Sequence, residues 1–178
     1  MTGLTASEVQ KFLDSARSAT DTDTQGKAYE ALAAYLFDAI PGCFTERNLI
    51  SYFKTEQIDV VVANNKQSDG LFPLPHVFLI ECKNWSHPVD SSTLGYFINI
   101  LRSRGVEAGV LIAANGITGD AADKTNAHAL GIAALKDGIK VLILTTEDIE
   151  RLTCTAELVD LIIRRFLRAY GLGGLGTP

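Results

Sequence analysis

Hydrophobic residues recur along this chain in two patterns, one typical of helices and the other of buried strands. Residues 24–40 are rich in alanine and leucine and end at Pro41-Gly42, which predicts a helix. Apolar side chains surround most of this helix, so we expect it to be substantially buried. A weaker helical spacing of apolar residues predicts one short helix within residues 1–22.

Runs of β-branched and other apolar residues predict the strands. The stronger runs cover residues 58–63, 76–83, 109–114 and 139–145, and a weaker one covers residues 44–50. Between and after them, the pattern predicts helices over residues 91–104, 119–136, 147–152 and 156–170. Because the last three strands alternate with helices, and strands that are apolar on both faces are buried on both, the pattern indicates an α/β fold with a mixed or parallel sheet.

A chain of 178 residues fits one domain. We expect an N-terminal extension over residues 1–22, a single domain over residues 23–170 and a flexible glycine-rich tail over residues 171–178. With 47% apolar and 21% charged residues, the composition excludes a largely disordered chain, a collagen and a simple coiled coil.

The cysteines and the apolar runs suggest a cytoplasmic protein without a membrane span. Three cysteines are present and none forms a CxxC pair, so a zinc ribbon or a thioredoxin-type site is disfavoured and free thiols are expected. No basic segment followed by an apolar run begins the sequence, so no signal peptide is expected. No uninterrupted apolar stretch approaches the ~18 residues of a transmembrane helix.

The formal net charge is −5, and most of the acidic excess lies in the first third of the chain. A protein that coats DNA without specificity is usually basic. Any nucleic-acid surface should therefore be local and lie in the middle or C-terminal part.

Two of the apolar strands are each interrupted by an acidic residue, Asp59 in the first and Glu81 in the second. A buried carboxylate is costly unless it is paired or binds a metal. Side chains alternate along a strand, so Glu81 and Lys83 should share one face while Cys82 faces the other way. If the two strands are antiparallel neighbours, Asp59 lies beside Glu81.

Two carboxylates and an ammonium on one surface suit phosphodiester hydrolysis. Asp59, Glu81 and the backbone carbonyl of Cys82 would offer hard oxygen ligands to Mg²⁺. Such an ion polarises a phosphoryl oxygen and lowers the pKa of a bound water. Lys83 could orient that water or stabilise developing negative charge. The alternative is that Asp59, Glu81 and Lys83 form ion pairs between strands that have only a structural role.

The order Asp59, then Glu81-Cys82-Lys83 at the end of an apolar strand, resembles the D…ExK pattern of the PD-(D/E)xK nuclease superfamily. Within it, residues 24–152 are most similar to the Mrr-type restriction endonuclease group, through IECKNW, GVLIAANG and IKVLILTTEDIERL. The resemblance implies a restriction endonuclease-like core, with a mixed four- to five-stranded sheet flanked by helices. It also implies a metal-dependent DNA endonuclease that uses Mg²⁺, with Mn²⁺ as a substitute.

The opening helix of that family often brings a glutamate to the site, and here the matching residue is Glu30. Its neighbours at helical spacing are apolar, so a carboxylate there needs a partner. The chain departs from the family pattern in carrying Ile58 before the aspartate and no glutamine in the helix after Lys83. No DNA-recognition motif is attached, which suggests a separate recognition or activating subunit. A homodimer would supply two sites for cutting both strands.

Several residues near this motif are candidates for nucleic-acid contacts. Trp85 could stack on a splayed base, although a single tryptophan is more often a packing anchor. The other candidates are Gln57, Asn84, Asn115, Thr118 and Lys124. Three arginines of the last predicted helix, Arg164, Arg165 and Arg168, could form a solvated face, a DNA-backbone patch or a subunit contact. The apolar stripe of that helix covers the sheet or forms an interface.

A second class of function stays open at this point. The domain could be a catalytically silent or partner-dependent module that binds nucleic acid or another protein, as its acidic total suggests. The complete set of Asp59, Glu81 and Lys83 favours the enzyme instead. A third hypothesis is a different enzyme with a carboxylate–lysine site in a cleft. The sequence has no GxxxxGK[ST] phosphate-binding loop, which disfavours an NTPase.

Overall fold

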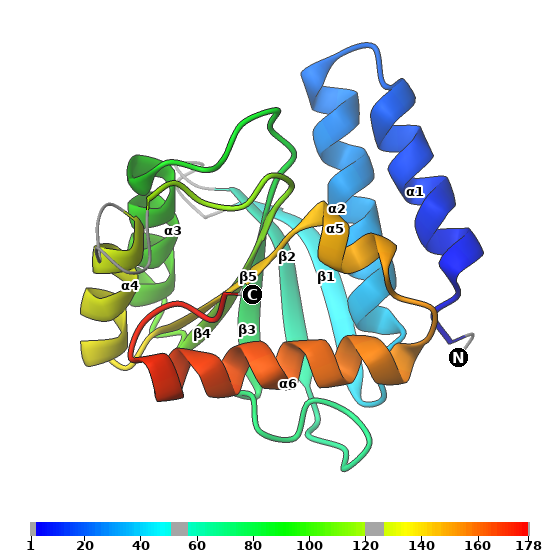
Figure 1. Ribbon diagram of the computed structural model, residues 1–178. Coiled ribbons are helices and arrows are strands. Elements are labelled where there is room, and N and C mark those ends of the chain that lie inside the picture. The colour runs from blue at the N-terminus through cyan, green and yellow to red at the C-terminus, as the bar shows by residue number, and fades with distance from the viewer. Residues whose placement is uncertain (1–2, 51–56, 120–126, 178) are drawn as a thin grey trace.

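The computed structural model describes residues 3–50, 57–119 and 127–177, which form three layers with a sheet in the middle (Figure 1). The helices are α1 (Ala6–Ser18), α2 (Thr22–Asp38), α3 (Ser91–Ser103), α4 (Ala127–Lys136), α5 (Thr146–Glu150) and α6 (Thr155–Leu172). The strands are β1 (Cys43–Ile50), β2 (Gln57–Asn64), β3 (Val77–Lys83), β4 (Ala108–Ala113) and β5 (Lys140–Leu144). None of these described helices is long and apolar enough to cross a membrane.

The five strands lie in the sheet in the same order as in the chain. β1, β2 and β3 are antiparallel neighbours, whereas β3, β4 and β5 run parallel to one another. The structure therefore confirms the predicted mixed sheet flanked by helices. All described residues of β4 and β5 are buried, as their apolar sequences predict for strands covered on both faces.

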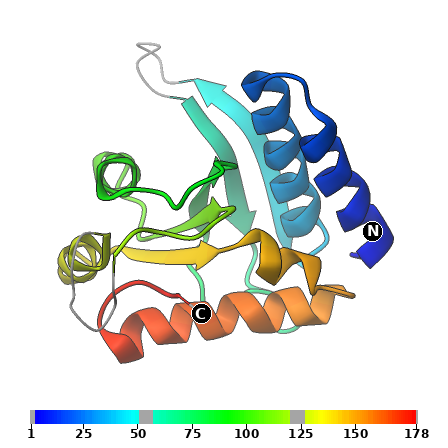
Figure 2. The same cartoon turned by 45° about the horizontal axis from the view of Figure 1, so that its top comes forward.

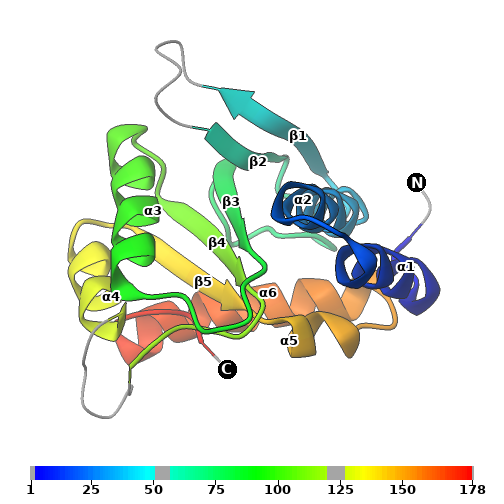
Figure 3. The ribbon, with the colours of Figure 1, turned by 90° about the horizontal axis from the view of Figure 1, so that it is seen from above.

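Each face of the sheet carries its own hydrophobic core. On one face, α1, α2, α5 and α6 pack over alternate side chains of β2 to β5. On the other face, α3 and α4 pack over the remaining side chains. Figure 3, seen from above, shows α3 and α4 on the opposite side of the sheet from α1 and α2. The apolar stripe of α6 covers the sheet, through Leu158, Ile162 and Phe166.

The C-terminal segment differs from the predicted flexible tail. Leu175 is buried under α4, and Gly176 pairs with the outer edge of β5. The Gly176 N–H donates to the Val141 carbonyl, and the Ile143 N–H donates to the Gly176 carbonyl, each over 2.9 Å. The described tail therefore satisfies backbone groups that an edge strand would leave open. The helix expected over residues 119–136 is described only from Ala127, because residues 120–126 lie outside the described part.

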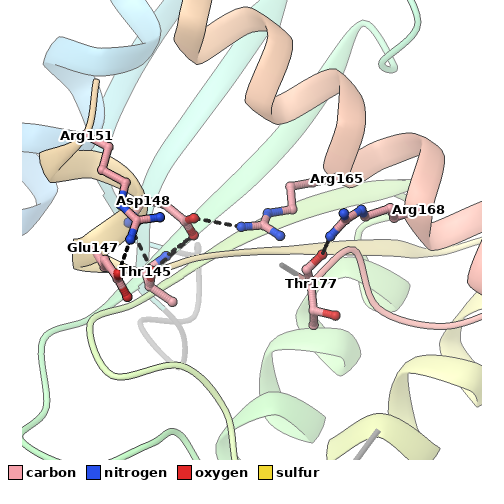
Figure 4. A network of polar contacts seen from close by, with 7 residues as sticks. All are labelled: Thr145, Glu147, Asp148, Arg151, Arg165, Arg168 and Thr177. Carbon is pink, nitrogen blue, oxygen red and sulfur yellow. Dashed lines mark hydrogen bonds and ion pairs between the residues drawn. The ribbon is translucent and has the colours of Figure 1, made fainter. Parts of the chain in front are cut away.

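A buried ion pair joins α6 to α5. Arg165 is only 4% exposed, and its Nη2 lies 2.8 Å from Oδ1 of Asp148 (Figure 4). Figure 2 shows α5 as the short orange helix directly after β5, with α6 running below it. The other carboxylate oxygen of Asp148 accepts hydrogen bonds from the N–H and the hydroxyl of Thr145, each over 3.0 Å, which completes a capping box for α5. This contact anchors the middle of α6 at the end of β5.

The neighbouring arginines are also engaged within the chain. Arg164 pairs with Asp160 on the exposed side of α6. Arg168 donates from Nη1 to the carbonyl of Thr177 over 3.1 Å and so helps to hold the C-terminal segment (Figure 4). The three arginines thus do not form one free basic patch, which argues against the DNA-backbone hypothesis for them.

We expect Arg165→Met to lower the free energy of unfolding by about 3 kcal/mol, because it leaves Asp148 without its buried cationic partner. Arg164→Met, one residue away, should cost less than about 1 kcal/mol, because its ion pair is exposed. Urea denaturation of both variants measures the difference. Equal stabilities would show that the buried pair does not anchor α6.

Candidate active site

The sheet splits at one end, and the predicted site lies in the split. β2 and β3 pair only from Val60 opposite Ile80 to Ala63 opposite Val77. Beyond this point β2 continues beside β1, while β3 continues beside β4. The next residues along the two separating strands are Asp59 and Glu81.

Asp59 bridges the split with its side chain. Its Oδ2 accepts a hydrogen bond from the backbone N–H of Cys82 over 2.8 Å. A carboxylate thus occupies the position where a strand carbonyl would otherwise complete the ladder. The contact brings Asp59 beside Glu81, as the sequence predicts for antiparallel neighbours.

Glu81 and Lys83 share one face of β3, again as predicted. The Lys83 Nζ lies 2.7 Å from Oε1 of Glu81, and both side chains are largely withdrawn from solvent. Cys82 points the other way, and its thiol donates to the carbonyl of Tyr29 on α2 over 3.8 Å. Burial raises the pKa of the Cys82 thiol, which makes a thiolate nucleophile unfavourable.

The backbone carbonyl of Cys82 faces the same side as Asp59. In a strand, the N–H and C=O of one residue point to the same neighbour, and successive residues alternate. The Lys83 carbonyl accepts from the Ala114 N–H on the β4 side, whereas the Cys82 N–H points to Asp59. The Cys82 carbonyl is therefore directed into the split, where β2 offers it no ladder partner.

Glu30 reaches the site from α2. It is 8% exposed, and its Oε2 has no hydrogen-bond partner in the part of the chain that the structure describes. The preceding residue, Tyr29, fixes the helix by a 2.7 Å hydrogen bond between its hydroxyl and that of Thr146. An unsatisfied buried carboxylate oxygen costs free energy, so its presence points to an absent partner.

Asn48 of β1 orients Glu30 and is the residue that sequence reasoning missed. It forms a side-chain hydrogen bond with Glu30, and its Oδ1 accepts from Nε2 of Gln57 over 3.1 Å. Asn48 has a φ of 58°, a left-handed conformation that asparagine tolerates better than most residues. Gln57, predicted to contact nucleic acid, thus lies beside Asn48 on the exposed side of β2. The signal in the sequence that could have indicated this role is an asparagine inside a run that otherwise resembles a strand.

The negative charge of the three carboxylates is only partly compensated by the described residues around them. Burial, together with the nearby charge of Asp59, raises the pKa of Glu81 to about 7. The pKa values of Asp59 and Glu30 are also raised, in both cases chiefly by burial. Burial opposes the charge of Lys83, but the adjacent carboxylates raise its pKa overall. Lys83 stabilises the ionised forms of Asp59 and Glu81, and Arg47 and Lys27 stabilise that of Glu30, but burial still raises all three pKa values. A further cation would stabilise the ionised forms of the three acids.

These donors fit a hard divalent cation. Among the described residues, no group of three His, Cys, Asp or Glu side chains encloses a metal by itself. Asp59, Glu81 and the Cys82 carbonyl nevertheless offer oxygen atoms on one side of the split, and Mg²⁺ is commonly held by one or two carboxylates with water completing its shell. The unpaired Oε2 of Glu30 supports the same reading, because it would accept a hydrogen bond from such water.

An open cleft of about 500 Å³ lies over this group. Its walls are the first turns of α2 and the loop that follows β3, and they include Glu30, Asp59 and Lys83. Asn84 and Trp85, both predicted to contact nucleic acid, also line the cleft.

The other two described candidates hold the wall rather than line it. The Nδ2 of Asn115 donates to the carbonyl of Trp85, and the N–H of Thr118 donates to the carbonyl of Val89 over 2.9 Å. Both bonds fasten the loop after β3 to the loop after β4. Lys124 lies outside the described residues.

A mixed sheet that carries an aspartate, a glutamate and a lysine where two strands separate defines a restriction endonuclease-like protein. The family model described as restriction endonuclease, the Mrr catalytic domain, matches residues 22–144, and the chain belongs to this family. The match confirms the resemblance drawn from the sequence and places the protein among nucleases of this type. No curated protein and no solved structure matches the chain.

The raised pKa of Glu81 predicts a pH-dependent stability in the presence of EDTA. Because the folded state holds this proton more tightly than the unfolded state, stability is lost as pH rises from about 4.5 to about 7. Glu81→Gln removes the charge, so the variant should be more stable than wild type at pH 8, by on the order of 1–3 kcal/mol.

Thermal unfolding at pH 4.5 and pH 8 tests this expectation, with the exposed Glu46→Gln as the matched control. The gain of the Glu81 variant should shrink at the lower pH. A gain of the same size at both pH values, or a loss at pH 8, would contradict it.

Proposed function

We propose that this protein is a divalent metal-dependent endonuclease that hydrolyses phosphodiester bonds in DNA, with Mg²⁺ as its ion and Mn²⁺ as a substitute. The observation that carries the proposal is the meeting of Asp59, Glu81 and Lys83 at the split between β2 and β3, under an open cleft. Membership of the restriction endonuclease family supports it. All three cysteines are free thiols, which fits the cytoplasmic location expected from the sequence.

Asp59, Glu81 and the Cys82 carbonyl would hold the ion, each supplying one oxygen. When bound, a divalent ion polarises the phosphoryl oxygen and lowers the pKa of a coordinated water. Glu30 supplies a further acceptor, oriented by Asn48, for water beside the ion or for a second ion.

Lys83 acts as a cation and a donor rather than as a base. Its pKa is raised by Glu81 and Asp59, so the ammonium keeps its proton at neutral pH. From its position beside Glu81 it can donate to the attacking water or to a phosphate oxygen that gains negative charge. Removing this donor should lower the rate more than the affinity for DNA, because its interaction strengthens as charge develops.

The charge of the cleft favours a second candidate, a partner-dependent module of the same fold. Among the described lining residues, Asp23, Glu30 and Asp59 are acidic and Lys83 carries the one ammonium, while Asp23 is paired with Lys27 of α2. Without a metal ion this surface repels a phosphate backbone. A recognition or activating subunit, or a homodimer that places two sites on one duplex, would supply the missing attraction.

Cleavage of supercoiled plasmid with Mg²⁺, Mn²⁺ or EDTA tests the proposed activity. Wild type should nick or linearise the plasmid with either ion and not with EDTA. Lys83→Ala should lower the rate by at least about 100-fold, the usual cost of losing one donor to the transition-state charge. Lys136→Ala, which removes an exposed lysine of α4, should cut at the wild-type rate. Equal cutting by the two variants would remove Lys83 from the mechanism.

Metal binding can be tested without any cleavage. At ten times its Kd, a metal ion that binds only the folded state adds about 1.4 kcal/mol, and the Tm of a domain this size should rise by about 3–6 °C. Asp59→Asn should abolish this rise, whereas Asp69→Asn, an exposed loop residue, should keep it. A metal-dependent rise without cleavage would favour an enzyme that awaits a partner. The absence of both would favour the silent module.

A further inference from the structure

Two aromatic rings stand in the wall of the cleft next to the catalytic lysine. The Trp85 ring centroid lies 5.9 Å from Nζ of Lys83 and 5.2 Å from the ring centroid of His87. Both residues line the cleft that contains Glu30 and Asp59. Trp85 also packs against the core under α3, so part of its ring is anchored while the rest lines the cleft.

The loop that carries these rings is held at both ends. At its start, the Trp85 carbonyl accepts from the Asn115 side chain. At its end, the buried Val89 forms two backbone hydrogen bonds, with Gly116 over 2.8 Å and with Thr118 over 2.9 Å. Asp90 then caps α3 by accepting from the Thr93 N–H over 2.8 Å. The rings are therefore placed before any ligand arrives, which lowers the entropic cost of binding.

If Trp85 only anchored the packing of the core, it would not need to be exposed in a cleft. If it stacks on a base, that exposure is required. Aromatic rings in nucleic-acid clefts stack on bases, because every base presents a π-face. If Lys83 contacts the phosphate that is cut, Trp85 lies within reach of the base on the adjoining nucleotide. In a continuous duplex both faces of each base are already stacked on the neighbouring base pairs. Only an unpaired or extruded base can therefore stack on the Trp85 ring.

The charge of the cleft points to the same kind of substrate. A duplex brings two phosphate backbones to a surface whose described lining holds one ammonium and three carboxylates, of which Asp23 is paired with Lys27. A single displaced strand brings only one backbone, and stacking then replaces part of the electrostatic attraction that this cleft lacks.

We propose that Trp85, with His87 beside it, stacks on an unpaired base next to the phosphate that is cut, so that the substrate is DNA carrying an unpaired nucleotide rather than continuous duplex. This inference rests on the proposed nuclease function for the phosphate's position. It assigns the Trp85–His87 wall as the subsite that reads strand structure, with no dependence on base sequence.

Trp85 is the only tryptophan, so fluorescence excited at wavelengths that tryptophan absorbs and tyrosine does not reports on this subsite alone. Three DNA probes of one sequence are titrated in EDTA: a full duplex, a duplex with one bulged nucleotide, and the same bulge with an abasic nucleotide. The bulged probe should quench the emission and bind about 10- to 100-fold more tightly than the other two. Equal quenching and affinity for the duplex or the abasic probe would overturn the inference.

Labelled-DNA anisotropy extends the test to variants without the fluorophore. Trp85→Ala should lose the preference for the bulged probe, whereas Trp85→Phe, which keeps a stacking ring and fills the same anchor, should retain most of it. Tyr96→Ala removes an aromatic ring that is 53% exposed on α3 and should leave the preference unchanged. A preference that survives in Trp85→Ala would assign base recognition elsewhere.

Cleavage of the same probes with Mg²⁺ separates this inference from the function on which it rests. Cutting of all three probes at equal rates would keep the nuclease and reject the stacking subsite. Selective binding of the bulged probe without any cutting would keep the subsite and reject the autonomous nuclease.

Discussion

Two strands that pair and then part create the candidate active site of this molecule. β2 and β3 share a ladder over four residue pairs, after which β2 follows β1 and β3 follows β4. At the point of separation, backbone groups that a continuous sheet would satisfy lie open. Asp59 satisfies one of them, the N–H of Cys82, and the carbonyl of the same residue stays available. The split therefore brings a carboxylate and a carbonyl to one place without breaking the hydrophobic core on either face.

The surrounding fold makes this arrangement rigid. β4 and β5 are buried along their whole described length, so they fix β3 from one side. α2 packs over β3 in the hydrophobic core and is joined to α5 by the Tyr29–Thr146 hydrogen bond. α6 lies across the sheet and is anchored by the buried pair of Arg165 and Asp148. Carboxylates that are held in place by a rigid core cannot move apart to relieve their repulsion. Burial in this core raises the pKa values of Asp59 and Glu81, and the charge of Asp59 raises that of Glu81 further.

Local patterns allowed most of the fold and the centre of the site to be predicted. The apolar runs predicted each strand, and alternation along β3 predicted that Glu81 and Lys83 share a face. These features depend on residues close together in the chain. Contacts between distant residues were beyond the same reasoning. Asn48 reaches Glu30 of α2 because it adopts a left-handed backbone conformation. The C-terminal segment packs against an open edge of β5, and the position of Trp85 depends on a hydrogen bond from Asn115.

The deficit of positive charge links metal, substrate and the aromatic wall. On the proposed function, a divalent ion serves as counterion for Asp59, Glu81 and Glu30 as well as ligand for the phosphate, so the cleft binds DNA more tightly when the ion is present. A basic cleft would bind any duplex through its backbone and would select little. An acidic cleft must draw its affinity from elsewhere, and Trp85 and His87 offer a source that only an unstacked base can reach. The excess of carboxylates in this cleft thus favours recognition of strand structure over recognition of charge.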